Sequence, residues 1–216
     1  MINISNLHFK DIFKNINFSI EKQSNTIIYS GVNTGSTLFL KMIDGIVSNI
    51  EGEFIVDSIN ITNLSTEETL SHSNKVSFVY ETNGLIHYLN IYDNIMLPLK
   101  KFKDYDEVLL NRLIDDFNIK NLLFKDPSEL SDIELKLVNI VRAIVVHPKI
   151  ILYDELDGGM DIDLLNSIIS KLSIYQKELG FLQIFTTVKK FEFDLYKNFD
   201  NKYLLFNKTL ERVECE

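Results

Sequence analysis

The sequence contains a single cysteine, Cys215, in 216 residues. One cysteine cannot supply a disulfide framework or a cysteine metal cluster within one chain. Basic residues are also scarce relative to acidic ones: 22 lysines and arginines stand against 31 aspartates and glutamates, which gives a formal net charge of −9. A negative chain repels phosphate backbones. We therefore expect no nucleic-acid partner.

Long apolar runs are missing as well. No stretch of about 18 apolar residues occurs, so we expect no membrane-spanning helix. The first residues, MINISNLHFKD, have neither a basic region nor a long apolar core and do not match a signal peptide. These absences predict a cytoplasmic protein. With 45% hydrophobic and 25% charged residues, and without internal repeats or linkers, the chain is expected to form one globular domain.

Residues 127–161 form the most informative stretch. Apolar residues three and four positions apart predict an amphipathic helix, and they are Leu137, Ile140, Val141 and Ile144. His147 and Pro148 should end this helix. Residues 150–153 are all apolar, which predicts a strand buried on both faces of a parallel sheet. Asp154 and Glu155 follow that strand directly, at the edge where α/β sheets bind ligands. They are either a solvated strand end or a Mg²⁺ ligand followed by a base for a water.

A second stretch has the order strand, loop, helix. Residues 26–29 predict a strand, residues 30–38 (SGVNTGSTL) a loop, and the following residues a helix that ends at Gly45. This is the context of a phosphate-binding loop with the pattern GxxxxGK[ST]. Ser30 stands at the first glycine and Ser36 at the lysine, whereas Gly35 and Thr37 are kept. On the motif alone, an ordinary strand–turn–helix connection is the better explanation. The candidate nucleotide-binding residues are Gly31, Asn33, Gly35, Ser36, Thr37 and Leu38.

Taken in order, these stretches resemble the ATP-binding (ATPase) subunits of ABC transporters. The similar segments are the loop at 30–38, Leu130-Ser131 at the signature motif, Asp154-Glu155 at Walker B and residues 158–161 at the D-loop. The resemblance covers nearly the whole chain. It implies an α/β fold, a P-loop NTPase-like ABC nucleotide-binding domain with an antiparallel β subdomain and an inserted helical subdomain. The expected single domain covers residues 1–216, with its core at 1–83 and 145–216 and the helical subdomain at 84–144.

The resemblance also implies roles for particular residues. Asp154 and Thr37 would hold Mg²⁺, and Glu155 would be the general base. Glu81 stands where the family has a glutamine that senses Mg²⁺ and the attacking water. Mg-ATP is the cofactor expected from the family. The positions at the signature motif and dimer interface are Ser131, Asp132 and Asp161.

Several family residues are replaced in this sequence. Ser36 replaces the phosphate-binding lysine, Asp132 and Ile133 replace signature glycines, and Val188 stands at the switch histidine. Ser131 and Glu134 fit the S-x-x-E capping box, so the helix start is expected to be capped by its own side chains. The acidic residues of the site face no matched lysine. We therefore expect Mg-ATP binding to be weak or absent and Glu155 to be vestigial.

Two functions follow from this pattern. The first is a degenerate ABC-type subunit, a structural or coupling partner in a membrane transport complex with little or no ATP hydrolysis. The alternative is a divergent but active ABC ATPase that powers transport and recruits another cation, such as Lys189 or one from a partner chain. The resemblance implies a membrane permease partner, and a homodimer or a heterodimer with another ABC ATPase subunit, on the inner face of the cell membrane. The expected permease contact is residues 85–99, whose apolar face of Tyr88, Ile91, Tyr92 and Ile95 fits either an interface or plain core about equally well.

Overall fold

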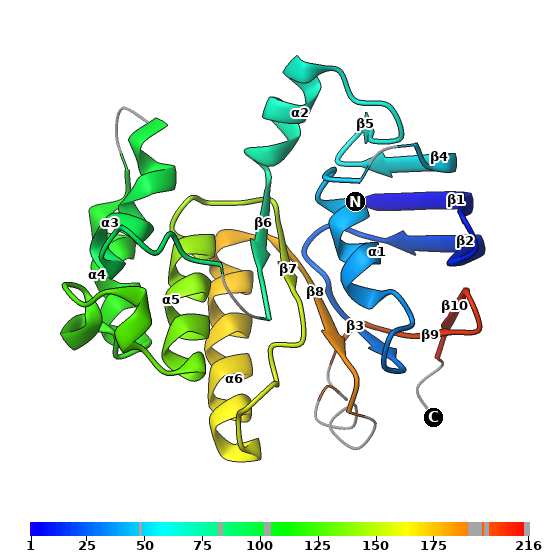
Figure 1. Ribbon diagram of the computed structural model, residues 1–216. Helices are drawn as coiled ribbons and strands as arrows, with labels where there is room; N and C mark the ends of the chain where they lie inside the picture. Colours follow the sequence, from blue (N-terminus) through cyan, green and yellow to red (C-terminus); the bar gives the residue numbers. More distant parts are fainter. Residues whose placement is uncertain (48, 82–83, 102–104, 190–195, 197–198, 214–216) are drawn as a thin grey trace.

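The computed structural model describes residues 1–47, 49–81, 84–101, 105–189, 196 and 199–213. Cys215 and the last residue of the predicted core segment 1–83 lie outside these ranges. Two sheets and a group of helices make up the described part (Figure 1). The limits of the helical subdomain at residues 84 and 144 remain predictions.

The smaller sheet is antiparallel, with the spatial order β2-β1-β4-β5. Its strands are β1 (Ile2–Phe9), β2 (Phe13–Ile20), β4 (Glu51–Val56) and β5 (Ile59–Asn60). Ile2 of β1 lies opposite Ile20 on one side and Val56 on the other. All three side chains are buried, so the alternation of apolar and polar residues turns one face of the sheet toward the core.

The larger sheet has six strands in the order β10-β9-β3-β8-β7-β6. They are β3 (Asn25–Ser30), β6 (Val76–Val79), β7 (Ile150–Tyr153), β8 (Leu182–Thr187), β9 (Asn201–Phe206) and β10 (Thr209–Arg212). Every neighbouring pair is parallel except β9 and β10. All residues of β7 and β8 are buried, as expected for central parallel strands covered on both faces. The carboxyl ends of β3, β6, β7 and β8 therefore meet at one edge.

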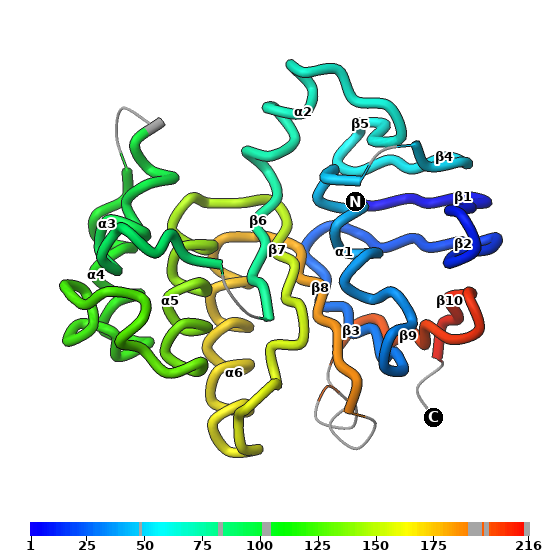
Figure 2. Tube along the Cα trace, viewed as in Figure 1, coloured from blue at the N-terminus to red at the C-terminus, as the bar shows by residue number. Residues whose placement is uncertain are grey.

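Helices cover both faces of this sheet (Figures 1 and 2). They are α1 (Ser36–Ile43), α2 (Thr66–Ser73), α3 (Ile91–Met96), α4 (Glu107–Asp116), α5 (Asp132–Ile144) and α6 (Ile162–Leu179), with short 3-10 turns η1 (Leu97–Lys101), η2 (Lys120–Leu122) and η3 (Pro127–Glu129). One buried cluster joins α3–α6 to one sheet face, for example through Ile151. The other joins α1 and the antiparallel sheet to the opposite face, for example through Leu152. None of the helices described is both long and apolar enough to cross a membrane.

Most of the expected elements are confirmed. Helix α5 begins after Ser131 and ends at Ile144, before His147, and Gly180 with φ 75° ends α6. The expected apolar face at residues 85–99 is wrong in part. Ile91 and Ile95 are fully buried because α3 packs on α5, whereas Tyr88 and Tyr92 are exposed by 86% and 37%. Among the described residues of this segment, the exposed large hydrophobic side chains are therefore the two tyrosines and Leu97, which is 38% exposed.

Candidate functional site

The loop between β3 and α1 has the shape of an anion-binding nest. Asn33 and Gly35 both have left-handed backbones, with φ of 61° and 100°. The Thr34 hydroxyl donates to the Gly31 carbonyl over 2.8 Å and closes the turn. No side chain caps the first turn of α1, so the amides of this turn are open to an anion. A Cβ at position 35 would lie 3.0 Å from the Phe13 ring, so the loop needs glycine there.

The side chains of the loop do not supply a cation. Ser36, at the lysine position, is only 6% exposed. Ser30, at the first glycine position, has a buried hydroxyl without a hydrogen-bond partner in the described part of the chain. Leu38 packs against the apolar cluster around α1. The backbone can therefore receive a phosphate, but no side chain from residues 30–38 neutralises it.

Asp154 lies at the carboxyl end of β7, close to this loop. Its Oδ1 accepts hydrogen bonds from the Thr37 hydroxyl at 3.0 Å and the Thr186 hydroxyl at 3.1 Å. Burial raises the pKa of Asp154, and the two hydroxyl donors oppose that shift. A hydroxyl and a carboxylate side by side are suitable oxygen ligands for Mg²⁺. No set of three or more histidines, cysteines or acids among the described residues is arranged to hold a metal, so phosphates and waters would have to complete the coordination of Mg²⁺.

Glu155 follows with a left-handed backbone, φ 44°. Its N–H donates to the Thr186 hydroxyl over 3.1 Å. Burial raises the pKa of the Glu155 carboxyl, the charges of Glu81, Asp154 and Asp157 raise it further, and Lys136 opposes them. The structure thus brings Glu81, Asp154 and Glu155 together, as the sequence predicts. A raised pKa suits a carboxylate that takes a proton near neutral pH.

Two lysines lie at the site: Lys136 was not expected, and Lys189 was expected only as a cation that could be recruited to the nucleotide. Lys136 on α5 is only 4% exposed and donates to backbone carbonyls of residues 155–158. Lys189 donates from Nζ to the Asp157 carbonyl over 3.0 Å. The expectation that no lysine opposes the acids is therefore wrong. Lys136 lies four positions before the buried Ile140, which places both residues on the same face of α5. This spacing is the feature of the sequence that could have indicated that Lys136 is buried.

Asp157 is a further acid that the sequence analysis missed. It is 1% exposed, and its Oδ2 accepts a hydrogen bond from the Thr187 hydroxyl at 2.8 Å. The Nζ of Lys189 lies 4.0 Å from the same oxygen. Lys189, the cation considered for recruitment to a phosphate, is thus already engaged with Asp157. Asp157 stands only two residues after Glu155, and that proximity in the chain could have suggested it.

The predicted capping box at the start of α5 is present. The Ser131 N–H and hydroxyl both donate to Glu134 Oε2 over 2.8 Å, and the Glu134 N–H donates to the Ser131 hydroxyl over 3.3 Å. These bonds from Ser131 lower the pKa of Glu134. Asp132 adds an exposed carboxylate in the same turn. Asp161 caps α6 in a similar way, accepting from the Leu164 N–H over 2.8 Å.

Replacing Ser131 with alanine should lower the free energy of unfolding by about 0.5–2 kcal/mol, because it removes the N-cap of α5. Mg-ATP affinity should not change. Denaturant melts and calorimetry measure the two quantities. The matched control is Ser65→Ala, since Ser65 and Glu68 form the same box at the exposed start of α2. An unchanged unfolding midpoint together with lost ATP-driven dimerisation would show that position 131 serves nucleotide instead.

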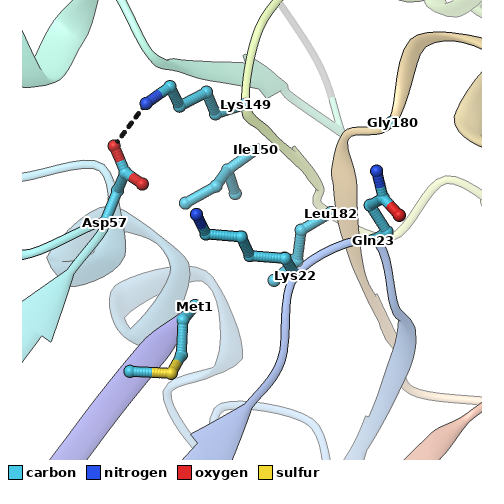
Figure 3. A pocket seen from close by; sticks show the side chains of 8 residues that line it. All are labelled: Met1, Lys22, Gln23, Asp57, Lys149, Ile150, Gly180 and Leu182. Carbon is cyan, nitrogen blue, oxygen red and sulfur yellow. Dashed lines mark hydrogen bonds and ion pairs between the residues drawn. The ribbon is translucent and has the colours of Figure 1, made fainter.

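A separate cavity of about 360 Å³ lies at the other edge of the large sheet (Figure 3). Lys149 and Ile150, at the start of β7, line it together with Lys22, Asp57 and Leu182. The Lys149 Nζ donates to Asp57 Oδ2 over 2.8 Å. None of the predicted site residues lines this cavity, so it is not part of the candidate site.

Comparison with known proteins agrees with this geometry. The sequence model of the ABC transporter family matches residues 13–157. The lipoprotein-releasing system ATP-binding protein LolD of Buchnera aphidicola is 29% identical over 75% of this chain and 73% of its own length. The molybdate/tungstate import ATP-binding protein WtpC of Pyrococcus abyssi is 26% identical over 81% of this chain, which spans about half of that relative (50%).

Solved structures show the same fold. A dimeric ATP-binding cassette in a post-hydrolysis state, bound to ADP and Pi, superposes with a TM-score of 0.86 and 20% sequence identity, covering 100% of both chains. CbiO1 from Clostridium perfringens, part of an ABC transporter complex, superposes with a TM-score of 0.83 and 21% identity, over 97% of this chain and 86% of its own. The fold class expected from the sequence is thus confirmed. Because the family model matches more than half of the chain, including the 30–38 loop and Asp154-Glu155, the chain belongs to the ABC transporter family of ATP-binding subunits.

Proposed function

We propose that this protein is a degenerate ABC-type subunit, a pseudo-ATPase that acts as a structural or coupling partner of a membrane permease. It binds Mg-ATP weakly and hydrolyses little or none. The observation that carries the proposal is the start of α5, where Ser131 and Glu134 satisfy each other. In the family, a phosphate from the opposite subunit is received at this position, but here it would meet Asp132 and Glu134.

The nucleotide site retains its shape, but position 36 supplies no cation. Lys41, whose charge favours the ionised form of Asp154, stands in the last turn of α1 and not in the first turn with the open amides. The open amides of the loop suit a phosphate. The pair of Thr37 and Asp154 would hold Mg²⁺, which would link the protein to the phosphate oxygens when bound. Losing the charge-assisted contact of a lysine costs about 1.5–3 kcal/mol of binding. Lys136 and Lys189 do not replace it, because their ammonium groups are bonded to carbonyls of residues 155–158. Phosphoryl transfer depends on positioning and charge stabilisation, so the rate of ATP hydrolysis should fall more than the affinity for ATP.

The coupling role is supported by a groove beside residues 85–99. It has a volume of about 370 Å³ and lies between α2, β6, α3–η1 and α5. Phe78, Tyr80, Leu97 and Pro98 line it with aromatic and aliphatic surface, and the Phe78 and Tyr80 rings stack at 4.2 Å. Tyr88 and Tyr92 stand exposed on the same segment. Polar side chains also line the groove, namely Asp44, Ser73, Asn74, Ser77 and Arg142. A groove that is apolar in part, beside a segment with exposed tyrosines, suits a short helix of a permease.

Calorimetric titration of the purified chain with Mg-ATP tests the nucleotide half of the proposal. We expect no low-micromolar binding, because Ser36 leaves the phosphates without a lysine. A melt with and without Mg-ATP gives a second reading, since a ligand that binds the native state raises the melting temperature. Thr37→Ala provides the matched control for any binding that is seen. Low-micromolar affinity that depends on Thr37 would contradict the proposal.

A divergent, active ATPase is the second candidate. It is favoured by the open amides of the 30–38 loop and by the raised pKa of Glu155, which suits a base. In that case Mg-ATP would stabilise the chain and Glu155→Gln would abolish a measurable hydrolysis. The subunit would then work as a homodimer or as a heterodimer with another ABC ATPase subunit, as members of its family do.

A further inference from the structure

The Lys136 ammonium lies in a pocket of backbone oxygens. Its Nζ donates to the carbonyls of Glu155 at 3.0 Å, Leu156 at 3.3 Å and Gly158 at 2.8 Å. An ammonium group has three N–H donors, so each can be used. A Cβ at position 158 would lie 2.8 Å from Nζ, and glycine there lets the loop approach the lysine closely. Three carbonyls around one point are also the ligand type that binds a free cation.

The charges around Lys136 are mostly negative. Burial lowers the pKa of Lys136, whereas Asp157, Glu81 and Glu155 favour its charged form, and Lys189 opposes it. An unsatisfied carbonyl or an uncompensated carboxylate at this depth would be costly. The Lys136 ammonium therefore has two effects. It donates hydrogen bonds to the carbonyls of the loop, and it neutralises part of the negative charge of the nearby carboxylates.

We propose that Lys136 is a built-in cation, a positioning residue whose ammonium fills an oxygen site that would otherwise bind a free cation and so holds residues 155–158 against α5 without nucleotide. This goes beyond the proposed function, because it applies whether or not the chain hydrolyses ATP. The backbone of Glu155 is then fixed from two elements. Its carbonyl is bonded to Lys136 on α5, and its N–H to Thr186 on β8. Lys136 thereby sets the direction of the Glu155 side chain without touching it.

The wild-type chain offers a direct test by nuclear magnetic resonance of lysine ammonium groups. A buried ammonium with three carbonyl acceptors exchanges its hydrogens slowly, and exposed lysines exchange fast. We expect a slow signal that disappears in Lys136→Gln. Lys22→Met is the control, because Lys22 is exposed and has no partner among the described residues. If Lys136 exchanges as fast as the exposed lysines, the proposal is overturned.

Replacement by an uncharged side chain tests the cation site itself. Lys136→Met should lower the melting temperature by about 6–20 °C, the shift expected when a buried charge loses its partner in a chain of this size. Ammonium chloride should restore part of this loss, because an ammonium ion fits the place that Nζ leaves empty. Choline chloride at the same concentration should not, because choline is too large for the site and has no N–H donor. The two salts should have the same effect as each other on the melting temperature of the wild type.

Lys136→Gln covers the case in which Lys136→Met does not fold, since glutamine keeps N–H donors and lacks the charge. Partial rescue of either variant by ammonium supports a cation site. Equal responses of variant and wild type to both salts would show that Lys136 contributes packing only, and would overturn the inference. Lys22→Met should melt as the wild type does in every salt.

Discussion

Replacing Ser36 with lysine should tighten Mg-ATP binding about 10- to 150-fold, the equivalent of one restored charge-assisted contact. The backbone of the loop already has the left-handed residues Asn33 and Gly35, and its first helical turn has no side-chain cap. Hydrolysis should nevertheless stay far below that of an intact family member. The start of α5 would remain filled by Ser131 and Glu134, and Val188 would remain at the switch-histidine position. Groups that act as one catalytic unit do not contribute additively.

Calorimetry measures the affinity, and phosphate release measures turnover. Ser36→Met is the matched control, since it has a similar length without the charge and should leave binding as weak as in the wild type. Restored turnover at family-like rates in Ser36→Lys would contradict the prediction. It would mean that the capped α5 and Val188 matter little, and the active-ATPase candidate would then be preferred.

Introducing a charge on the exposed tyrosine face should release the protein from its membrane complex. Tyr92→Asp removes an exposed aromatic side chain and places a carboxylate on the proposed contact surface, so binding should weaken about 30-fold or more, as for an interface hot spot. Folding should be preserved, because Tyr92 is 37% exposed. The measurement is the fraction of protein recovered with membranes of cells that express it, together with a thermal melt.

Ile174→Asp serves as the control for that experiment, because Ile174 is 62% exposed on α6, outside residues 85–99. It should leave membrane recovery unchanged. Equal recovery of Tyr92→Asp and the wild type, or no recovery with membranes for either, would remove the main support for a coupling role.

The sequence predicts what is encoded locally. Four apolar residues before Asp154 suffice for a buried parallel strand, and the spacing of Ser131 and Glu134 suffices for a capping box. Helix α2 was missed because it has no apolar stripe: among its residues only His72 is buried, and its Nε2 contacts the Ile43 carbonyl at 2.8 Å. The capping pair Ser65 and Glu68 was its local sign.

Features that depend on packing between distant segments could not be predicted in the same way. Ile91 and Ile95 are buried because α3 meets α5, and no property of residues 85–99 alone says which side of the helix faces solvent. Similarly, Lys136 reaches the carbonyls of Glu155, Leu156 and Gly158 only once α5 packs against β6 and the segment after β7 comes within reach. The charge balance of the site therefore required the fold, although every charged residue was visible in the sequence.

The close approach of Gly35 to Phe13 explains why the shape of the 30–38 loop does not depend on a lysine at position 36. The Phe13 ring lies under the loop, meets Phe39 edge-on at 6.0 Å, and Phe39 in turn meets Phe18 at 5.5 Å. The side chains that support the loop are thus aromatic, and they come from β2 of the antiparallel sheet and from α1. Packing of the interior therefore stabilises the curvature of the loop, which needs no bound ligand. A substitution at position 36, such as Ser36→Lys, should accordingly change the charge of the loop and leave its backbone in place.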